Sequence, residues 1–324
     1  MAKNNEKGSG IMKYVLLFSL VILFSIFPQK SEAENAPSGL SIDPVFQEIT
    51  LKAQDEQAEF FVHLKNNTDQ AVTLKPSVVD FGSLDESGGV AFLGQNKDVG
   101  QKYALASWMR PEKDSIFLDP HASEALRVVI ENRDTFSPGG HYAALLFRSG
   151  EEEDANVSDN AVAVQELVSV LVFAKKEGGE IYDLKLTGEE WSKNFFVLPT
   201  DIRLRFQNQG NVHVVPRGII VIHDPLGKEV QKGVINPESS ILLPETFRNY
   251  ATSLRSLRLA WLPGTYTIFT QYRYDGTETN TFQEEHFLLI PWQGIGIGLL
   301  LIFFLWILVR APWKKPVIKE KIKD

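Results

Sequence analysis

The sequence of 324 residues contains no cysteine. This absence excludes disulfide bonds, thiolate metal ligands and thiol nucleophiles. An exported animal protein of this size would normally carry disulfides, whereas a bacterial envelope protein can rely on its hydrophobic cores alone. For an exported chain, the lack of cysteine therefore favours a bacterial envelope protein.

Motifs for catalysis and nucleotide binding are missing as well. The sequence has no GxSxG elbow, no P-loop and no GxGxxG, and glycines 294, 296 and 298 belong to a long apolar segment. The acidic run 151–154 lacks the alternating ligands and the turn glycine of a calcium loop, which favours a solvated loop. None of the six histidines has HExxH spacing: His63, His121, His141, His213, His223 and His286. We predict no enzyme, no cofactor and no metal site; an active site that converges from distant loops is the alternative.

An excess of basic residues is also missing. The sequence has 33 Lys and Arg against 41 Asp and Glu, a net charge of −8. Six of the basic residues lie within 310–324, so the rest of the chain is more acidic still. Since nucleic-acid binding needs a basic surface, we predict no nucleic-acid partner.

The N-terminus has the pattern of a secretory signal peptide. Lys13 precedes an apolar run over 14–27, which spans only about 21 Å as a helix, against roughly 30 Å for a hydrocarbon core. Ser31 and Ala33 are small residues that suit cleavage before Glu34. We predict a signal peptide over 1–33, with an uncleaved anchor helix as the alternative.

A second apolar segment lies near the C-terminus. Twelve of the fifteen residues 295–309 are Ile, Leu, Phe or Val and none is charged, which corresponds to an insertion free energy of about −4 to −7 kcal/mol. We predict a transmembrane helix over 291–310. Because basic residues follow it, we predict a cytoplasmic tail over 311–324, so that the ectodomain lies outside a cell membrane crossed once.

Residues between the two ends alternate with the period of two that is typical of β-strands. Phe60, Val62 and Leu64 alternate with mostly polar neighbours, and 202–207 repeats the pattern. Turn residues such as 138–140 and 275–276 separate these runs. The pattern predicts an all-β ectodomain of short strands, arranged as β-sandwiches.

Two sets of matching landmarks indicate that one fold occurs twice. Asn66 and Asn208 each follow a strand, 115–120 matches 240–244, and Pro138-Gly139-Gly140-His141-Tyr142 matches Pro263-Gly264-Thr265-Tyr266. We expect Leu118 to correspond to Leu243, and Tyr142 and Tyr266 to lie on equivalent strands. The predicted domains are 34–177 and 178–290, with a linker near 175–180 and an added loop or hairpin over 83–109 in the first.

These features resemble the WxL-interacting proteins of bacterial surfaces. The resemblance rests on 65–68, 115–120, 138–142 and 168–173, together with 206–211 and 263–266 in the second module. It implies two tandem immunoglobulin-like sandwiches followed by a membrane anchor. It also implies a first module that binds peptidoglycan and a second that binds a host or partner surface. The first module is similar, too, to the N-terminal domain of periplasmic pilus chaperones.

Anchored β-sandwiches without catalytic motifs are typical of binding proteins. We predict a membrane-anchored bacterial surface protein that binds or scaffolds, with a cell-wall polymer or an exported surface protein as partner and with lipid contacted through its helix. The binding residues are not identified, although the added segment 83–109 and exposed strand edges are the expected contact sites. The alternative function is a chaperone-like assembly factor that pairs strand edges with an exported subunit.

Overall fold

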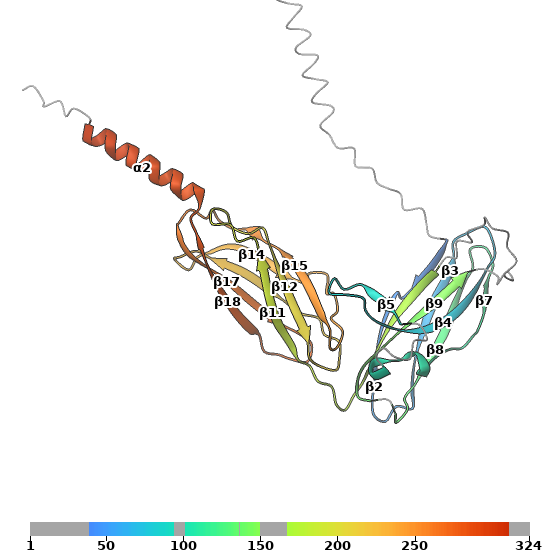
Figure 1. The fold of residues 1–324 in the computed structure, drawn as a ribbon. Coiled ribbons are helices and arrows are strands. Elements are labelled where there is room, and N and C mark those ends of the chain that lie inside the picture. The colour runs from blue at the N-terminus through green and yellow to red at the C-terminus, as the bar shows by residue number, and fades with distance from the viewer. Residues whose placement is uncertain (1–38, 94–100, 136, 150–166, 311–324) are drawn as a thin grey trace, which may run out of the picture. The chain divides into compact units, whose positions relative to one another are not determined.

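A computed structural model describes residues 39–93, 101–135, 137–149 and 167–310 (Figure 1). The described residues from Leu40 to Arg310 belong to one compact unit. The predicted signal peptide, the acidic run 151–154 and the basic tail lie outside the described residues.

The first sandwich consists of two sheets that face each other across a hydrophobic core. One sheet has four strands in the order β1-β3-β8-β6, and the other has six, in the order β2-β10-β9-β4-β5 with β7 paired to β4. The strands are β1 (Leu40–Asp43), β2 (Phe46–Leu51), β3 (Gln57–Asn66), β4 (Val72–Ser83), β5 (Val90–Phe92), β6 (Met109–Pro111), β7 (Ile116–Leu118), β8 (Ser123–Glu131), β9 (Gly139–Ser149) and β10 (Leu167–Lys176). Two short 3₁₀ turns, η1 (Gln101–Tyr103) and η2 (Ala106–Trp108), precede β6.

The second sandwich has a three-stranded sheet, β11-β12-β15, and a five-stranded sheet, β16-β14-β13-β17-β18. Its strands are β11 (Leu184–Trp191), β12 (Asp201–Asn208), β13 (Arg217–His223), β14 (Glu229–Ile235), β15 (Phe247–Ser253), β16 (Arg255–Ser256), β17 (Gly264–Arg273) and β18 (Thr281–Leu289). The all-β prediction is confirmed. Each sandwich has a core of its own, and the exact domain limits at 177 and 178 stay a prediction.

Alternation along the strands builds both cores. Phe60, Val62 and Leu64 of β3 are buried while the residues between them are exposed. In β12, Ile202, Leu204 and Phe206 follow the same pattern. A strand directs successive side chains to opposite faces of its sheet, so this period places one row in the core and the other in solvent.

A buried asparagine supports the predicted repeat of the fold. Asn66 Nδ2 donates hydrogen bonds to the carbonyls of Gln70, Leu118 and Asp119, and its Oδ1 accepts one from the Thr68 amide. In the second sandwich, Asn208 Nδ2 donates to the carbonyls of Val212 and Leu242, and its Oδ1 accepts from the Gly210 amide. Each side chain thus closes its own turn and ties that turn to a distant segment.

This correspondence corrects one predicted match. Leu118 pairs with Val72, six residues after Asn66, while Leu242 forms a bridge with Val214, six residues after Asn208. Leu118 therefore corresponds to Leu242, and the predicted match with Leu243 is wrong by one residue.

The two tyrosines lie on corresponding strands but on opposite faces. Tyr142 is on β9, between β4 and β10, and Tyr266 is on β17, between β13 and β18. Tyr266 is in the core, and its hydroxyl donates to Leu262 O at 2.8 Å, the tyrosine corner of immunoglobulin-like folds. His141 takes this place in the first sandwich, where its Nε2 lies 2.8 Å from Ser137 O. Tyr142 therefore points away from the core.

The helix α2 (Trp292–Arg310) begins directly after β18 and Pro291 (Figure 1). Among the described residues it is the one helix long and apolar enough to cross a membrane, and none of its side chains is buried in the protein. This result agrees with the predicted membrane anchor; the orientation of the chain stays a prediction.

Candidate binding site at the junction of the sandwiches

The outer face of the first sandwich carries a row of aromatic rings across four strands. Phe46 of β2 lies 4.7 Å from Phe173 of β10, Phe173 lies 5.4 Å from Tyr142, and Tyr142 lies 5.9 Å from Phe81 of β4, measured between ring centroids. Ile241 and Leu243 of the second sandwich pack against the cluster that contains three of these rings. The aromatic row is thus the apolar part of a junction between the sandwiches.

His213 of the second sandwich closes one side of the aromatic row. Its ring makes edge contacts with Tyr142 at 5.6 Å and with Phe173 at 5.1 Å. The Tyr142 hydroxyl lies 3.3 Å from Nδ1, and Glu48 Oε1 lies 3.4 Å from Nε2. A neutral imidazole protonated on Nε2 satisfies both contacts, because it accepts from the hydroxyl and donates to the carboxylate.

The order of carboxylate, imidazole and hydroxyl resembles that of a nucleophilic triad, but burial argues for a structural role. Tyr142 is only 1% exposed, so its oxygen does not face a space where a substrate could bind. Burial raises the pKa of the Tyr142 hydroxyl well above its usual value, which keeps it protonated. The bond to His213 lowers the pKa of Glu48. The three groups therefore fix the junction.

Asn211 joins the linker to both sandwiches. Its backbone carbonyl accepts the Gly140 N–H of β9 at 2.8 Å, and its Nδ2 donates to Gly179 O at 2.9 Å. Its Oδ1 accepts the Ile181 N–H at 2.7 Å. Gly139 has a φ of 121°, and a Cβ there would lie 2.8 Å from Asn211 O, so this approach requires glycine.

Part of the added segment that was predicted over 83–109 forms a hairpin, and residues 94–100 lie outside the described residues. Residues 81–83 of β4 pair with β5, and the turn reaches the second sandwich. Glu86 accepts two hydrogen bonds from the Arg205 guanidinium, at 2.8 and 2.6 Å, and its backbone carbonyl accepts the Asn249 N–H at 2.8 Å. The Arg205 bonds lower the pKa of Glu86. Lys102, after the hairpin, forms an ion pair with Glu245.

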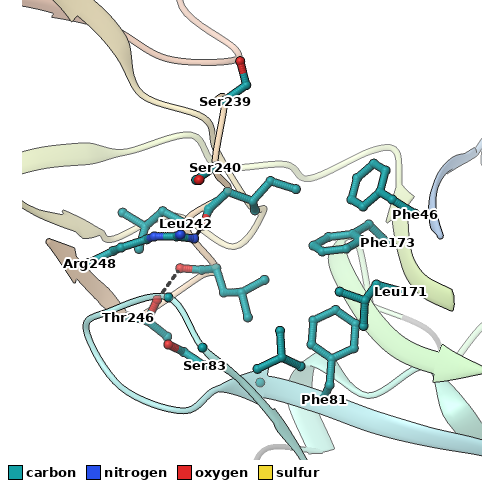
Figure 2. Close-up of a pocket in the computed structure, with 16 residues that line it drawn as sticks. Phe46, Phe81, Ser83, Leu171, Phe173, Ser239, Ser240, Leu242, Thr246 and Arg248 are labelled. Carbon is teal, nitrogen blue, oxygen red and sulfur yellow. Dashed lines mark hydrogen bonds between the residues drawn. The ribbon is translucent and has the colours of Figure 1, made fainter. Parts of the chain in front are cut away.

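A pocket of about 370 Å³ lies between the hairpin and the aromatic row (Figure 2). Figure 2 shows the side chains of Phe46, Phe173, Leu171 and Phe81 on one wall, facing residues of the second sandwich. The opposite wall is formed by residues 239–243, with Thr246 and Arg248. We refer to this space as the junction pocket. Its size falls within the roughly 300–1,000 Å³ of small ligand sites.

Two polar side chains of the junction pocket, Arg248 and Thr246, already have partners within the protein. Arg248 donates to Ile241 O at 2.5 Å, and its guanidinium carbon lies 5.3 Å from the Tyr250 ring centroid. Thr246 Oγ1 donates to Leu243 O at 2.9 Å. Gly88 of the hairpin turn has a φ of 91°, and a Cβ there would lie 2.1 Å from the Arg248 guanidinium carbon. Apolar side chains therefore dominate the surface that is left for a ligand.

The histidines that the sequence singled out do not come together. Among the described residues, no group of three or more His, Asp or Glu side chains is placed to hold a metal ion. His213 lies at the junction, and His141 is tied to backbone carbonyls within its own sandwich. His121 pairs with Asp69 on the surface, and His286 lies 3.0 Å from Thr267 Oγ1.

Among known proteins, solved structures of low sequence identity are similar to this chain. No family model matches the sequence, and no curated protein matches it. Solved structures of similar fold include the class 5 fimbriae chaperone CfaA, which is 12% identical with a TM-score of 0.42 over 78% of this chain and 99% of that one. The YadV chaperone is 10% identical with a TM-score of 0.35, over 78% and 100% of the two chains. A complex of the CsuC chaperone and the tip subunit CsuE from Acinetobacter baumannii has 10% identity and a TM-score of 0.36, over 76% and 98%.

At these identities the likeness concerns the fold alone. Pilus chaperones, to which the first module was predicted to be similar, are among these structures, and the matches cover more of the chain than the first sandwich. The predicted resemblance to WxL-interacting proteins has no support from a family match.

Proposed function

We propose that the chain is a membrane-anchored, non-enzymatic binding protein that holds an apolar segment of a protein partner in the junction pocket. The observation that carries this proposal is the apolar junction pocket, which lies beside the aromatic row. The hairpin lines the pocket and is bonded to the second sandwich through Glu86 and Arg205. The helix α2 keeps the pocket at the surface of a membrane. We place the ectodomain outside the cell and the basic tail in the cytoplasm, and protease treatment of spheroplasts tests this: a tag after Asp324 stays protected.

The chemistry of the pocket favours a protein segment over a wall polymer. A sugar chain presents many hydroxyls, and each needs a hydrogen-bond partner when it leaves water. The polar side chains Thr246 and Arg248 are engaged within the protein, whereas the opposite wall offers phenyl and aliphatic groups. A hydrophobic side chain that enters such a pocket is the usual anchor of a protein interface.

Two substitutions on opposite walls test the binding site. Peptides selected by display against the full chain should carry apolar residues, and their affinity is measured by fluorescence anisotropy. Leu171→Ser and Ile241→Ser each remove an apolar contact worth up to about 1.5–3 kcal/mol, so we expect Kd to rise by up to roughly 10- to 150-fold. Val234→Ser is the matched control, because Val234 is 55% exposed on β14 outside the junction pocket. Unchanged affinity in both wall variants would refute the proposed site.

The free edge of β2 favours a second candidate function, strand addition by an assembly factor. In its sheet β2 pairs only with β10 among the described strands. Leu171 N–H donates to Val45 O and Glu177 N–H to Leu51 O. In a parallel ladder these bonds direct the odd-numbered residues of β2 to β10, so the N–H groups of Phe46, Glu48 and Thr50 point to the outer edge.

One substitution separates the two candidates. Thr50→Pro removes an outward N–H and keeps the bonds to β10, so it should weaken a partner that adds a strand and leave one that fills the pocket unaffected. Loss of binding in Thr50→Pro together with normal binding in Leu171→Ser would favour strand addition.

A further inference from the structure

Loops at one end of the second sandwich expose a cluster of large apolar side chains. We call them the helix-end loops: 192–200 between β11 and β12, 224–228 between β13 and β14, and 257–263 between β16 and β17. Seven residues of these loops are between 47 and 67% exposed: Phe195, Phe196, Val197, Leu226, Leu257, Leu259 and Trp261. A patch of this kind on a folded domain marks a surface that contacts something apolar.

Hydrogen bonds and strand register place the three loops around the start of α2. Ile290 N–H, just before the helix, donates to Phe195 O at 2.7 Å, and Leu257 N–H donates to Val230 O at 2.8 Å. Leu289, the last residue of β18, pairs with Gly264 at the beginning of β17. A Cβ on Gly264 would lie 2.8 Å from Pro225 Cγ, which brings the loop 224–228 to the same end.

The opposite end of the second sandwich differs from the helix-end loops in its exposed apolar surface and in its charge. Its loops, 209–216, 236–246 and 274–280, contain none of the exposed large hydrophobic side chains. They contain four acidic residues and no Lys or Arg: Glu238, Glu245, Asp275 and Glu278. The helix-end loops contain three basic residues, Lys193, Lys228 and Arg258, against one acidic residue, Asp224. Apolar surface and positive charge are therefore gathered at the end where the helix begins.

The length of α2 fixes the depth of this end. Its 19 residues span about 28 Å at about 1.5 Å per residue, close to the roughly 30 Å of a hydrocarbon core. All 19 residues of α2 are needed to cross the hydrocarbon core, so Trp292, the first residue of the helix, lies at the boundary between hydrocarbon and headgroups. A Cβ on Gly294 would lie only 2.1 Å from Trp261 O, so the loop 257–263 packs against the first turn of the helix. The loop is thereby held at headgroup level.

We propose that the helix-end loops form a lipid-binding surface, which rests in the headgroup region of the leaflet that α2 enters. The inference depends on α2 spanning the bilayer and is independent of the junction pocket. Aromatic side chains prefer this region, and Lys and Arg beside them attract anionic lipids. Contact through three loops in addition to the helix restricts the tilt of the second sandwich on the membrane.

Because the chain has no cysteine, a single introduced cysteine can be labelled at a chosen position without removing any native residue. Single cysteines are introduced into the full chain as Phe196→Cys and Leu259→Cys, labelled with a nitroxide and reconstituted in phosphatidylcholine vesicles that contain phosphatidylglycerol. Val234→Cys, at a similarly exposed apolar position away from these loops, is the control, and Phe303→Cys in the middle of α2 verifies the span. All four positions are exposed, so the fold should tolerate each change.

We expect the labels at 196 and 259 to lose access to a water-soluble nickel chelate and to collide with oxygen, at a depth of about 5–10 Å in the interface. The label at 234 should stay accessible to the chelate. Labels at 196 and 259 that behave like the label at 234, while the label at 303 is deep, would overturn the inference and leave the anchor and the pocket intact. A label at 303 that is accessible to the chelate would contradict the premise that α2 spans the bilayer, and so would overturn the inference. Protection that is lost when the chain is diluted in the vesicles would assign the surface to a second copy and also overturn it.

Discussion

Replacing Tyr142 by phenylalanine removes one hydroxyl from the junction and leaves the ring in place. The ring keeps its contacts with Phe81 and Phe173, so the apolar packing is unchanged. The substitution removes the hydroxyl that lies 3.3 Å from His213 Nδ1. His213 is only 7% exposed. The variant therefore isolates a single polar contact between the two sandwiches.

The expected effect follows from the burial of His213. A buried acceptor without its donor costs about 1–3 kcal/mol. That cost applies to the closed junction, because an opened junction exposes His213 to water. The population in which the sandwiches separate should therefore rise by about 5- to 150-fold.

Amide hydrogen exchange at Gly140 measures this population. The Gly140 N–H donates to Asn211 O across the junction at 2.8 Å, so its exchange reports opening of the junction. We expect its rate to rise in Tyr142→Phe by the factor given above. Tyr266→Phe is the matched control, because that hydroxyl donates to Leu262 O within the second sandwich. An unchanged Gly140 rate in Tyr142→Phe, or an equal rise in the control, would show that the hydroxyl does not couple the sandwiches.

Two further predictions concern stability. Asn66→Ala and Asn208→Ala should each lower the free energy of unfolding by about 1–3 kcal/mol, measured in urea, because buried carbonyls lose their donors; exposed Asn280→Ala should change nothing. The pKa of Glu48 lies below its ordinary value of 4.5. The ionised Glu48 carboxylate therefore stabilises the folded protein fully above pH 4.5, and this stabilisation is lost as the pH falls through the lowered pKa. Thermal unfolding of Glu48→Gln should lack this step; an identical profile would contradict the His213 contact.

The sequence patterns predicted the strands and the core rows because alternation is a local signal. Phe60 and Ile202 identify their buried faces within a few neighbouring residues. The predicted correspondence of strands for Tyr142 and Tyr266 is confirmed, and the opposite faces of their side chains did not follow from a comparison of residue types. The structure follows position after the Pro-Gly turn, and there His141 replaces the tyrosine.

The junction could not be predicted from local patterns. Glu86 meets Arg205 and Asn249 over sequence separations of 119 and 163 residues, and no spacing rule connects them. In the sequence Phe173 is one residue of the segment 168–173, and its outward direction depends on the register of β10. The added segment 83–109 was predicted as a contact site for a partner, which stays a prediction; its described residues Glu86 and Lys102 contact the second sandwich. One available signal was the unusual length of that segment.

The exchange of tyrosine for histidine at the turn before β9 gives the two sandwiches different responses to acid. His141 lies within 3.0 Å of two carbonyl oxygens, and a neutral ring can donate to only one of them. Burial lowers the pKa of His141 below its ordinary value of 6.5, so protons bind the unfolded chain first and the first sandwich loses stability as the pH falls below 6.5. Burial raises the pKa of Tyr266 to about 12, so the hydroxyl stays protonated in acid. The bond from Tyr266 to Leu262 O in the second sandwich therefore does not change as the pH falls. At the same position of the two sandwiches, acid therefore weakens the bond made by His141 and leaves the bond made by Tyr266 unchanged.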